Sequence, residues 1–148
     1  MGLSEMLHMI VEQTRDYPMR MEYDPQTGTF RESAYRSLAF ARGFTMPYGW
    51  IQESGTPPQP HWDCILLSDK NFALGDKVEI TVIGVFERAD GDHKYIATEA
   101  TRGIFELAEI TDEERDELHK LYPCIREGEG WFGRERAEWC MKHHAKVR

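Results

Sequence analysis

Apolar and polar residues alternate from 78 to 84 with the period of two that is typical of β-strands. Sequence rich in β-formers resumes at 95–98, and the segment between contains Asp90-Gly91-Asp92. A glycine-containing turn between two such runs is typical of a β-hairpin. The sequence therefore predicts a two-stranded ribbon over residues 77–100.

Charged residues crowd the turn of this predicted ribbon. Asp90 and Asp92 lie in the turn, Glu87 precedes it and Lys94 follows it. Asp and Gly are common in tight turns for conformational reasons alone, so one interpretation is a solvated turn. The other interpretation is a site for a cation or a phosphate group.

Four more segments have strand-like patterns. Apolar residues predict a first strand over 8–13, a hairpin over 20–31 with Pro and Gly at its corner, and strands over 48–51 and 61–67. Within the hairpin, Arg20 and Glu22 share one face because they are two residues apart. The stretch 33–47 is expected to be irregular or a short helix, and the prolines of 53–60 predict a stiff surface loop.

The pattern changes to helical spacing after the predicted ribbon. Thr111 and Glu114 form a capping-box pattern, and the apolar stripe that follows ends at Pro123. A second helix is expected after Gly133. Five or six short strands followed by two helices predict an α+β fold, mainly β, built as a small barrel or curled sheet with helices on one side.

Composition narrows the functional classes. The chain has 148 residues and a net charge of −8 with a pI near 5.2, which predicts one domain over 1–148 and disfavours nucleic-acid binding. No apolar run reaches the length of a membrane span, and the first residues lack a secretory pattern. Three widely spaced cysteines predict reduced thiols. We therefore expect a cytoplasmic protein without a membrane partner.

The residues alone allow a cation site near Asp63, a zinc site or a nucleic-acid surface, and they do not favour the last two. Asp63 lies among apolar neighbours, where a carboxylate needs a cation or hydrogen bonds. A zinc site from His61-x-x-Cys64 and Cys140-x-x-His143 is disfavoured because positions three apart on a strand face opposite sides. A nucleic-acid surface would use aromatic residues for stacking, but the acidic charge favours packing roles for them. These aromatic residues are Tyr48, Trp50 and Trp62.

Several separate segments, spread over residues 12–131, resemble the soluble family I inorganic pyrophosphatases in order and spacing. That family usually has a Lys-x-Glu-x-Asp hairpin, a Tyr-Gly-Tyr/Phe-Ile segment, an Asp-x-Lys pair, a His-Tyr-Lys triplet and a Gly-Trp pair. The matching segments here are Arg20-x-Glu22-Tyr23-Asp24 with Thr27-Gly28, Tyr48-Gly49-Trp50-Ile51, Gly84-Val85 leading to Asp92-x-Lys94, Leu118-His119-Lys120, and Glu129-Gly130-Trp131.

The resemblance implies an OB-like five-stranded barrel, followed by two helices, that hydrolyses diphosphate with several magnesium ions or another divalent cation. It also implies a homo-oligomer. In such a site, carboxylates gather hard cations while Arg, Lys and Tyr donors hold phosphoryl oxygens. The catalytic residues implied are Tyr48, Asp63 and Lys94. The implied metal ligands are Asp63 and Asp92, with Glu87 or Asp90 as a further one and Glu12 and Glu22 at the rim. The implied phosphate contacts are Arg20, Arg36, Tyr48, Lys94, His119 and Lys120.

The chain departs from the family in its signature, Asp-x-Asp-Pro-x-Asp. The aligned segment runs from Pro58 to Asp63, with Pro58 and Pro60 where the first two carboxylates belong. Either neighbouring groups substitute for them, with His61 and Glu53 nearest in sequence, or the chemistry is altered or lost. The alternative to an enzyme is a relative that binds a phosphorylated ligand or nucleotide without hydrolysing diphosphate.

Overall fold

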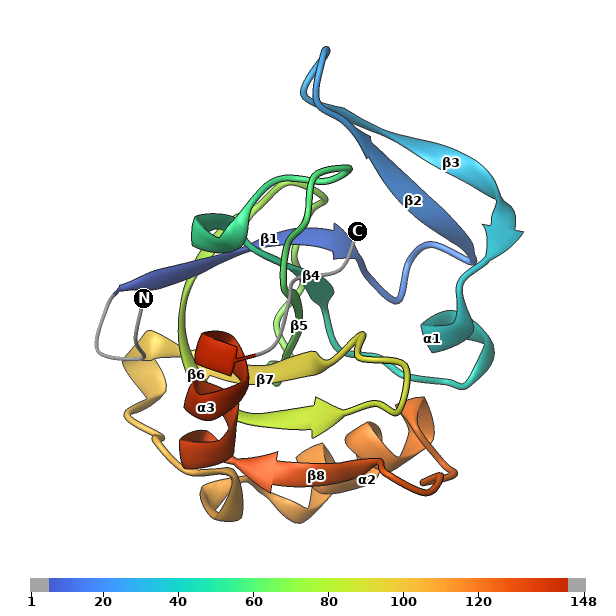
Figure 1. Ribbon diagram of the computed structural model, residues 1–148. Helices are drawn as coiled ribbons and strands as arrows, with labels where there is room; N and C mark the ends of the chain where they lie inside the picture. The colour runs from blue at the N-terminus through green and yellow to red at the C-terminus, as the bar shows by residue number, and fades with distance from the viewer. Residues whose placement is uncertain (1–5, 144–148) are drawn as a thin grey trace.

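A closed five-stranded barrel forms the body of the protein (Figure 1). The structure is a computed structural model that describes residues 6–143. β1 pairs with both β4 and β6, and this double pairing closes the sheet. β5 and β7 run parallel, and the other neighbours in the barrel are antiparallel. In spatial order the barrel strands are β1 (Leu7–Gln13), β4 (Tyr48–Ile51), β5 (Asp63–Leu66), β7 (Lys94–Glu99) and β6 (Lys77–Glu87).

The predicted ribbon over 77–100 is confirmed as the antiparallel pair β6 and β7. The alternation predicted for residues 78–84 was wrong beyond Val82, because the register of β6 against β7 shifts between Val82 and Gly84. From Val82 to Glu87 every residue of β6 is buried. Val82 and Val85 enter one hydrophobic core with buried residues of α3 (Arg134–His143), and Ile83 enters a second core with Leu118 and Leu121. β8 (Gly130–Gly133) pairs along the edge of this segment.

A separate hairpin of β2 (Met19–Asp24) and β3 (Thr29–Arg36) projects beyond the barrel (Figure 1). It confirms the predicted hairpin, although β3 continues to Arg36, five residues further than predicted. Tyr23 of β2 packs on Trp50 of β4, with 5.2 Å between ring centroids. This aromatic contact ties the hairpin to the barrel.

The helices confirm the two predicted after the ribbon, and a short third helix lies between β3 and β4. α1 (Leu38–Ala41) lies in the stretch expected to be irregular or a short helix. α2 (Asp112–Leu121) has the capping box of Thr111 and Glu114, with both hydrogen bonds formed. Three short 3-10 helices complete the described elements: η1 (Gln52–Ser54), η2 (Ala100–Arg102) and η3 (Leu107–Glu109).

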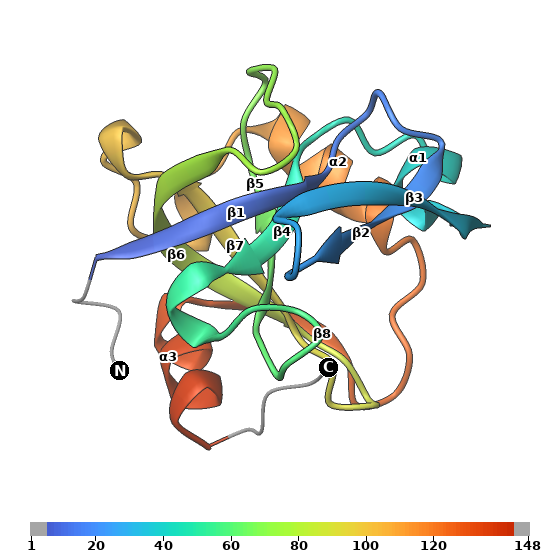
Figure 2. The same cartoon turned by 90° about the horizontal axis from the view of Figure 1, so that it is seen from above.

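Alternate residues of the barrel enter two cores. Cys64 and Leu66 of β5 belong to one core with buried residues of α3, whereas Ile65 belongs to the other with Leu118 and Leu121 of α2. The two helices accordingly lie on different sides of the barrel (Figure 2). The fold is thus the predicted OB-like α+β barrel, with β8 as an additional strand.

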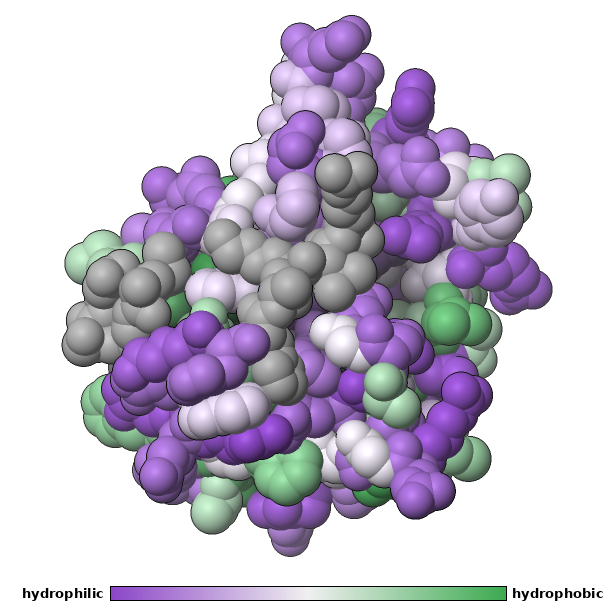
Figure 3. Space-filling view, viewed as in Figure 1, coloured by the Kyte–Doolittle hydropathy of each residue, from purple (hydrophilic) through white to green (hydrophobic). Residues whose placement is uncertain are grey.

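The face of the molecule seen in Figure 3 is mainly hydrophilic, with isolated apolar side chains among hydrophilic ones. Within residues 6–143, no helix is long and apolar enough to cross a membrane.

Candidate active site

Lys94 holds two carboxylates together at one end of the barrel. Its Nζ atom lies 2.7 Å from Oδ2 of Asp63 and 3.0 Å from Oδ2 of Asp92. The lysine begins β7 and Asp63 begins β5, and the parallel register pairs the two residues directly. Only 8% of the lysine side chain is exposed. Sequence reasoning named all three residues, and the structure brings them together.

His61 contacts the second oxygen of Asp63. Its Nε2 lies 3.1 Å from Oδ1 of Asp63, and its Nδ1 lies 2.8 Å from the carbonyl oxygen of Gln59. Burial works against ionisation of Asp63, but the hydrogen bond from His61 and the charge of Lys94 outweigh it and hold the aspartate pKa well below its usual range. Asp63 therefore enters the site as a carboxylate whose two oxygens are both engaged.

Glu12 of β1 and Tyr48 of β4 complete the group around Lys94. Burial, and next the charge of Asp63, raise the pKa of Glu12 to about 7, although His61, Arg20 and Lys94 oppose the shift. The Nζ atom of Lys94 lies 5.8 Å from the centroid of the Tyr48 ring. Burial also raises the pKa of Tyr48 well above its ordinary value, so the phenol stays protonated and can donate a hydrogen bond.

The contribution of Glu12 to the free energy of unfolding should fall between about pH 4.5 and pH 7, because its pKa is raised in the folded protein. The unfolded chain ionises this group first, so its contribution is fully present below pH 4.5 and is lost as pH rises through 7. We expect Glu12→Gln to reduce this fall by about 1–3 kcal/mol in urea unfolding at several pH values. The matched control is Glu127→Gln at an exposed position. A wild-type profile retained in Glu12→Gln would contradict the assignment.

Tyr122 also belongs to this centre, although sequence reasoning placed it in the apolar stripe of a helix. Its ring stacks on Phe86, with 4.4 Å between centroids, and the guanidinium carbon of Arg88 lies 5.7 Å from the Tyr122 centroid. Burial raises the Tyr122 pKa, while Lys94 and Arg88 lower it, which places the phenol within the field of the centre. The sequence signal available was a tyrosine directly before Pro123, at the end of α2.

Glu87 lies in a different contact from the one expected. Both of its carboxylate oxygens accept hydrogen bonds from Arg136 of α3, at 2.6 and 2.7 Å. The Arg136 guanidinium also stacks over Trp139, with 4.1 Å from its carbon to the ring centroid. Glu87 is therefore part of the attachment of α3 to the barrel, and its predicted role as a metal ligand gains no support from this position.

His119 and Lys120 lie on the exposed side of α2. The His119 ring is 6.3 Å from that of Trp131, and Lys120 pairs with Glu117 on its own helix. Their predicted phosphate contacts stay predictions, and the tyrosine that follows them, Tyr122, is the residue of this segment that the structure places near Lys94.

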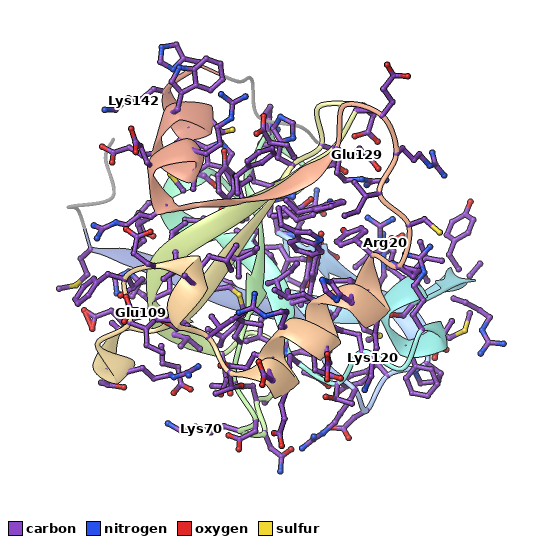
Figure 4. All side chains as sticks on the ribbon, turned by 90° about the horizontal axis from the view of Figure 1, so that it is seen from below. Arg20, Lys70, Glu109, Lys120, Glu129 and Lys142 are labelled. Atoms are coloured by element: carbon purple, nitrogen blue, oxygen red, sulfur yellow. The ribbon has the colours of Figure 1, made fainter. Side chains whose placement is uncertain are left out.

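The remaining predicted residues lie around the rim. Arg20 influences Glu12 electrostatically, and Figure 4 shows it on the same side of the molecule as Lys120 of α2 and away from Lys142 of α3. Glu22 is exposed on β2 opposite Arg31, and Arg36 is exposed at the end of β3. Asp90 stays in the turn, where its Oδ1 accepts a hydrogen bond from the amide of Asp92. Of these four, Arg20 acts electrostatically on Glu12, and the pKa of Asp90 is lowered mainly by this hydrogen bond from Asp92, with a smaller effect from Lys94.

A sequence model described as inorganic pyrophosphatase matches residues 9–146. The chain belongs to the inorganic pyrophosphatase family. A search of curated proteins gives no match.

Solved structures give the same fold. The pyrophosphatase of Neisseria gonorrhoeae is 17% identical, with a TM-score of 0.72, and the match covers 94% of this chain and 88% of that one. For Helicobacter pylori the values are 16% identity, a TM-score of 0.68, and 95% and 92% coverage. The pyrophosphatase of Thermus thermophilus is 22% identical, with a TM-score of 0.63, and the match covers 92% of this chain and 87% of that one. At these identities the likeness establishes the barrel, and the chemistry has to be argued from the residues present.

Magnesium is the cofactor that membership of this family implies, and the oxygen atoms of Asp63 and Asp92 would be its first ligands. Both oxygens of Asp63 already accept hydrogen bonds, and Asp92 shares Lys94 with it. The loop before Asp63 offers prolines at 58 and 60. Among residues 6–143, no group of three or more His, Cys, Asp or Glu side chains is arranged to hold a metal ion. The described residues therefore do not fit a cluster of protein-bound ions.

The two residues considered as substitutes for the signature carboxylates lie in different places. Glu53 accepts hydrogen bonds from the backbone amide and the ring Nδ1 of His8, at 2.6 and 2.8 Å, so it joins η1 to β1. His61 does reach the centre through Asp63. Trp62 is buried in the barrel core and Trp50 is buried against Tyr23 and Phe30 of the hairpin, so neither ring presents an exposed face for stacking bases.

Proposed function

We propose that this protein is a pyrophosphatase-like phosphohydrolase that splits diphosphate into two phosphates. The observation that carries the proposal is the buried Lys94 ammonium, held by Asp63 and Asp92 at the mouth of a pyrophosphatase barrel. Two phenol-bearing side chains, Tyr48 and Tyr122, lie beside it. A fixed cation with adjacent hydroxyl donors suits the oxygens of a phosphoryl group.

In the proposed reaction, a water oxygen forms a bond to one phosphorus atom and the bond from that phosphorus to the bridging oxygen breaks. Lys94 and Arg20 offset charge on the phosphoryl oxygens, and Tyr48 donates a hydrogen bond. Glu12 makes no ion pair in the described part of the chain, so its carboxylate is the group available to accept the proton of the water. A divalent cation enters as part of the substrate, bound to diphosphate.

The proposal predicts phosphate release from diphosphate in the presence of magnesium. We expect Tyr48→Phe to lower kcat about tenfold, because it removes one hydroxyl donor and keeps the ring beside Lys94. The control is Tyr35→Phe, at a tyrosine that is 70% exposed on β3. Steady-state release of phosphate is the measurement. Absence of release at stoichiometric enzyme would contradict hydrolysis.

A second candidate function is binding of a phosphorylated ligand without turnover. It is favoured by one observation, the engagement of both Asp63 oxygens in a chain that has Pro58 and Pro60 at the aligned signature positions. Loss of positioned acids removes barrier-lowering contacts while leaving cationic groups for binding. Saturable binding of diphosphate that survives unhydrolysed over hours would favour this candidate.

A further inference from the structure

Side-chain cations surround the acids of this centre. Lys94 contacts Asp63 and Asp92 directly, and His61 contacts Asp63 from the other side. Arg88 reaches toward the same aspartate as Lys94, with its Nη1 atom 3.8 Å from Oδ2 of Asp92. Asp63 and Asp92, two of the carboxylates that would receive a metal ion, are thus already neutralised by the protein, whereas Glu12 forms no ion pair in the described part of the chain.

A metal ion would have to displace these contacts to bind. Magnesium takes oxygen ligands at about 2.0–2.1 Å in near-octahedral geometry, so two aspartates that share it must turn their oxygens toward one point. In this structure that point between Asp63 and Asp92 is occupied by Nζ of Lys94, which is itself 8% exposed. Displacing the ammonium would leave it buried without partners, which is costly.

The loop that precedes Asp63 adds no compensating donor. Residues 55–60 contain no carboxylate, and Pro58 and Pro60 are exposed. The end of this loop is fixed by His61, whose Nδ1 faces the Gln59 carbonyl and whose Nε2 faces Asp63. A metal ion that binds without diphosphate would therefore have few available oxygen ligands on this side of the centre.

We infer that the centre holds no resident metal ion of its own, because side-chain cations engage Asp63 and Asp92, and that it binds the diphosphate group directly and takes a divalent ion only together with that group. This inference rests on the proposed function for the choice of ligand. Diphosphate carries the negative charge that Lys94, Arg20 and Arg88 can meet without giving up the aspartates. Its own oxygens then supply the ligands that a divalent ion lacks in the free protein.

Calorimetric titration of the full chain tests this inference without any need for turnover. We expect magnesium alone to give no saturable binding up to about 1 mM, where a built site of several carboxylates would fill. Methylenediphosphonate, a non-hydrolysable diphosphate analogue, is expected to bind in excess EDTA. Adding magnesium to the analogue should tighten binding about tenfold or more, because the ion then has ligands from both sides.

Two variants sharpen the test. Arg88→Gln should weaken metal-free binding of the analogue about tenfold, since it removes a cation from the rim of the centre and leaves the Lys94 contacts in place. The matched control is Lys142→Gln, an exposed cation of α3 that pairs only with Glu138 in the described part of the chain. The control should bind the analogue as the unchanged protein does.

Saturable binding of magnesium alone at micromolar concentration, lost in Asp63→Asn, would overturn the inference. Failure of the analogue to bind without metal would overturn it equally. These outcomes are separate from the fate of the proposed reaction. If the analogue binds without metal but no phosphate is released from diphosphate, hydrolysis is contradicted and this inference stands. If phosphate is released by a protein that binds magnesium tightly on its own, this inference is contradicted and hydrolysis stands.

Discussion

Lys94→Met is expected to abolish phosphate release and to lower the free energy of unfolding by about 3–5 kcal/mol. The substitution keeps an unbranched side chain of similar length and removes the charge that Asp63 and Asp92 share at 2.7 and 3.0 Å. Asp63, whose side chain is 16% exposed, would then keep only His61 as an ion-pair partner within residues 6–143. Urea unfolding measures the stability, and phosphate release at raised enzyme concentration measures the activity.

The matched control for this variant is Lys70→Met. Lys70 also forms an ion pair with a carboxylate, that of Glu99, at 2.7 Å, but its side chain is 64% exposed. An exposed pair contributes about 0–1 kcal/mol, so this control should retain both stability and activity. Equal stability losses in the two variants would show that the burial of Lys94 does not matter, and would contradict the assignment of the centre.

Gly49→Ala is expected to destabilise the barrel by more than about 4 kcal/mol or to prevent folding. A Cβ atom built on Gly49 would lie only 1.8 Å from the carbonyl oxygen of Ile10 and 3.2 Å from Cα of Val11. Both contacts are backbone atoms of β1, which pairs with β4 at this point, so no side chain can move to relieve them. Circular dichroism and urea unfolding of the purified variant give the measurement.

Gly133→Ala provides the control for this substitution. Gly133 also lies on a strand, but its added Cβ would meet nothing closer than 3.6 Å, the distance to Oε2 of Glu106. We expect its stability to remain within about 0.5 kcal/mol of the unchanged protein. A stable, folded Gly49→Ala variant would show that β1 and β4 are not as close as described.

Elements set by local pattern could be predicted from the sequence. The capping box of Thr111 and Glu114 marked the start of α2 because both hydrogen bonds are made within one turn. The β6–β7 ribbon was marked by its alternation and its glycine turn. β8 could not be recognised as a strand because it has four residues, two of them glycine, and forms through pairing with a distant segment.

The residues of the candidate site also differ in how far the sequence could predict them. Asp63, Asp92 and Lys94 were chosen from residue type and resemblance, and the barrel brings them into contact. The partner of Glu87 could not be predicted, because Arg136 is 49 residues away and several arginines were available. Tyr122 was missed because a tyrosine at helical spacing reads equally well as core packing.

The parallel ladder of β5 and β7 sets how much the centre can adapt to a ligand. Asp63 and Lys94 face each other at the first register position of that ladder, so the spacing of their backbones is fixed by strand hydrogen bonds and not by loops. A rigid pair of this kind recognises one size of charged group and cannot close around a smaller one. Selectivity among phosphate compounds would then depend on the segments that surround the pair, chiefly the projecting hairpin that carries Arg20 and the proline loop before His61.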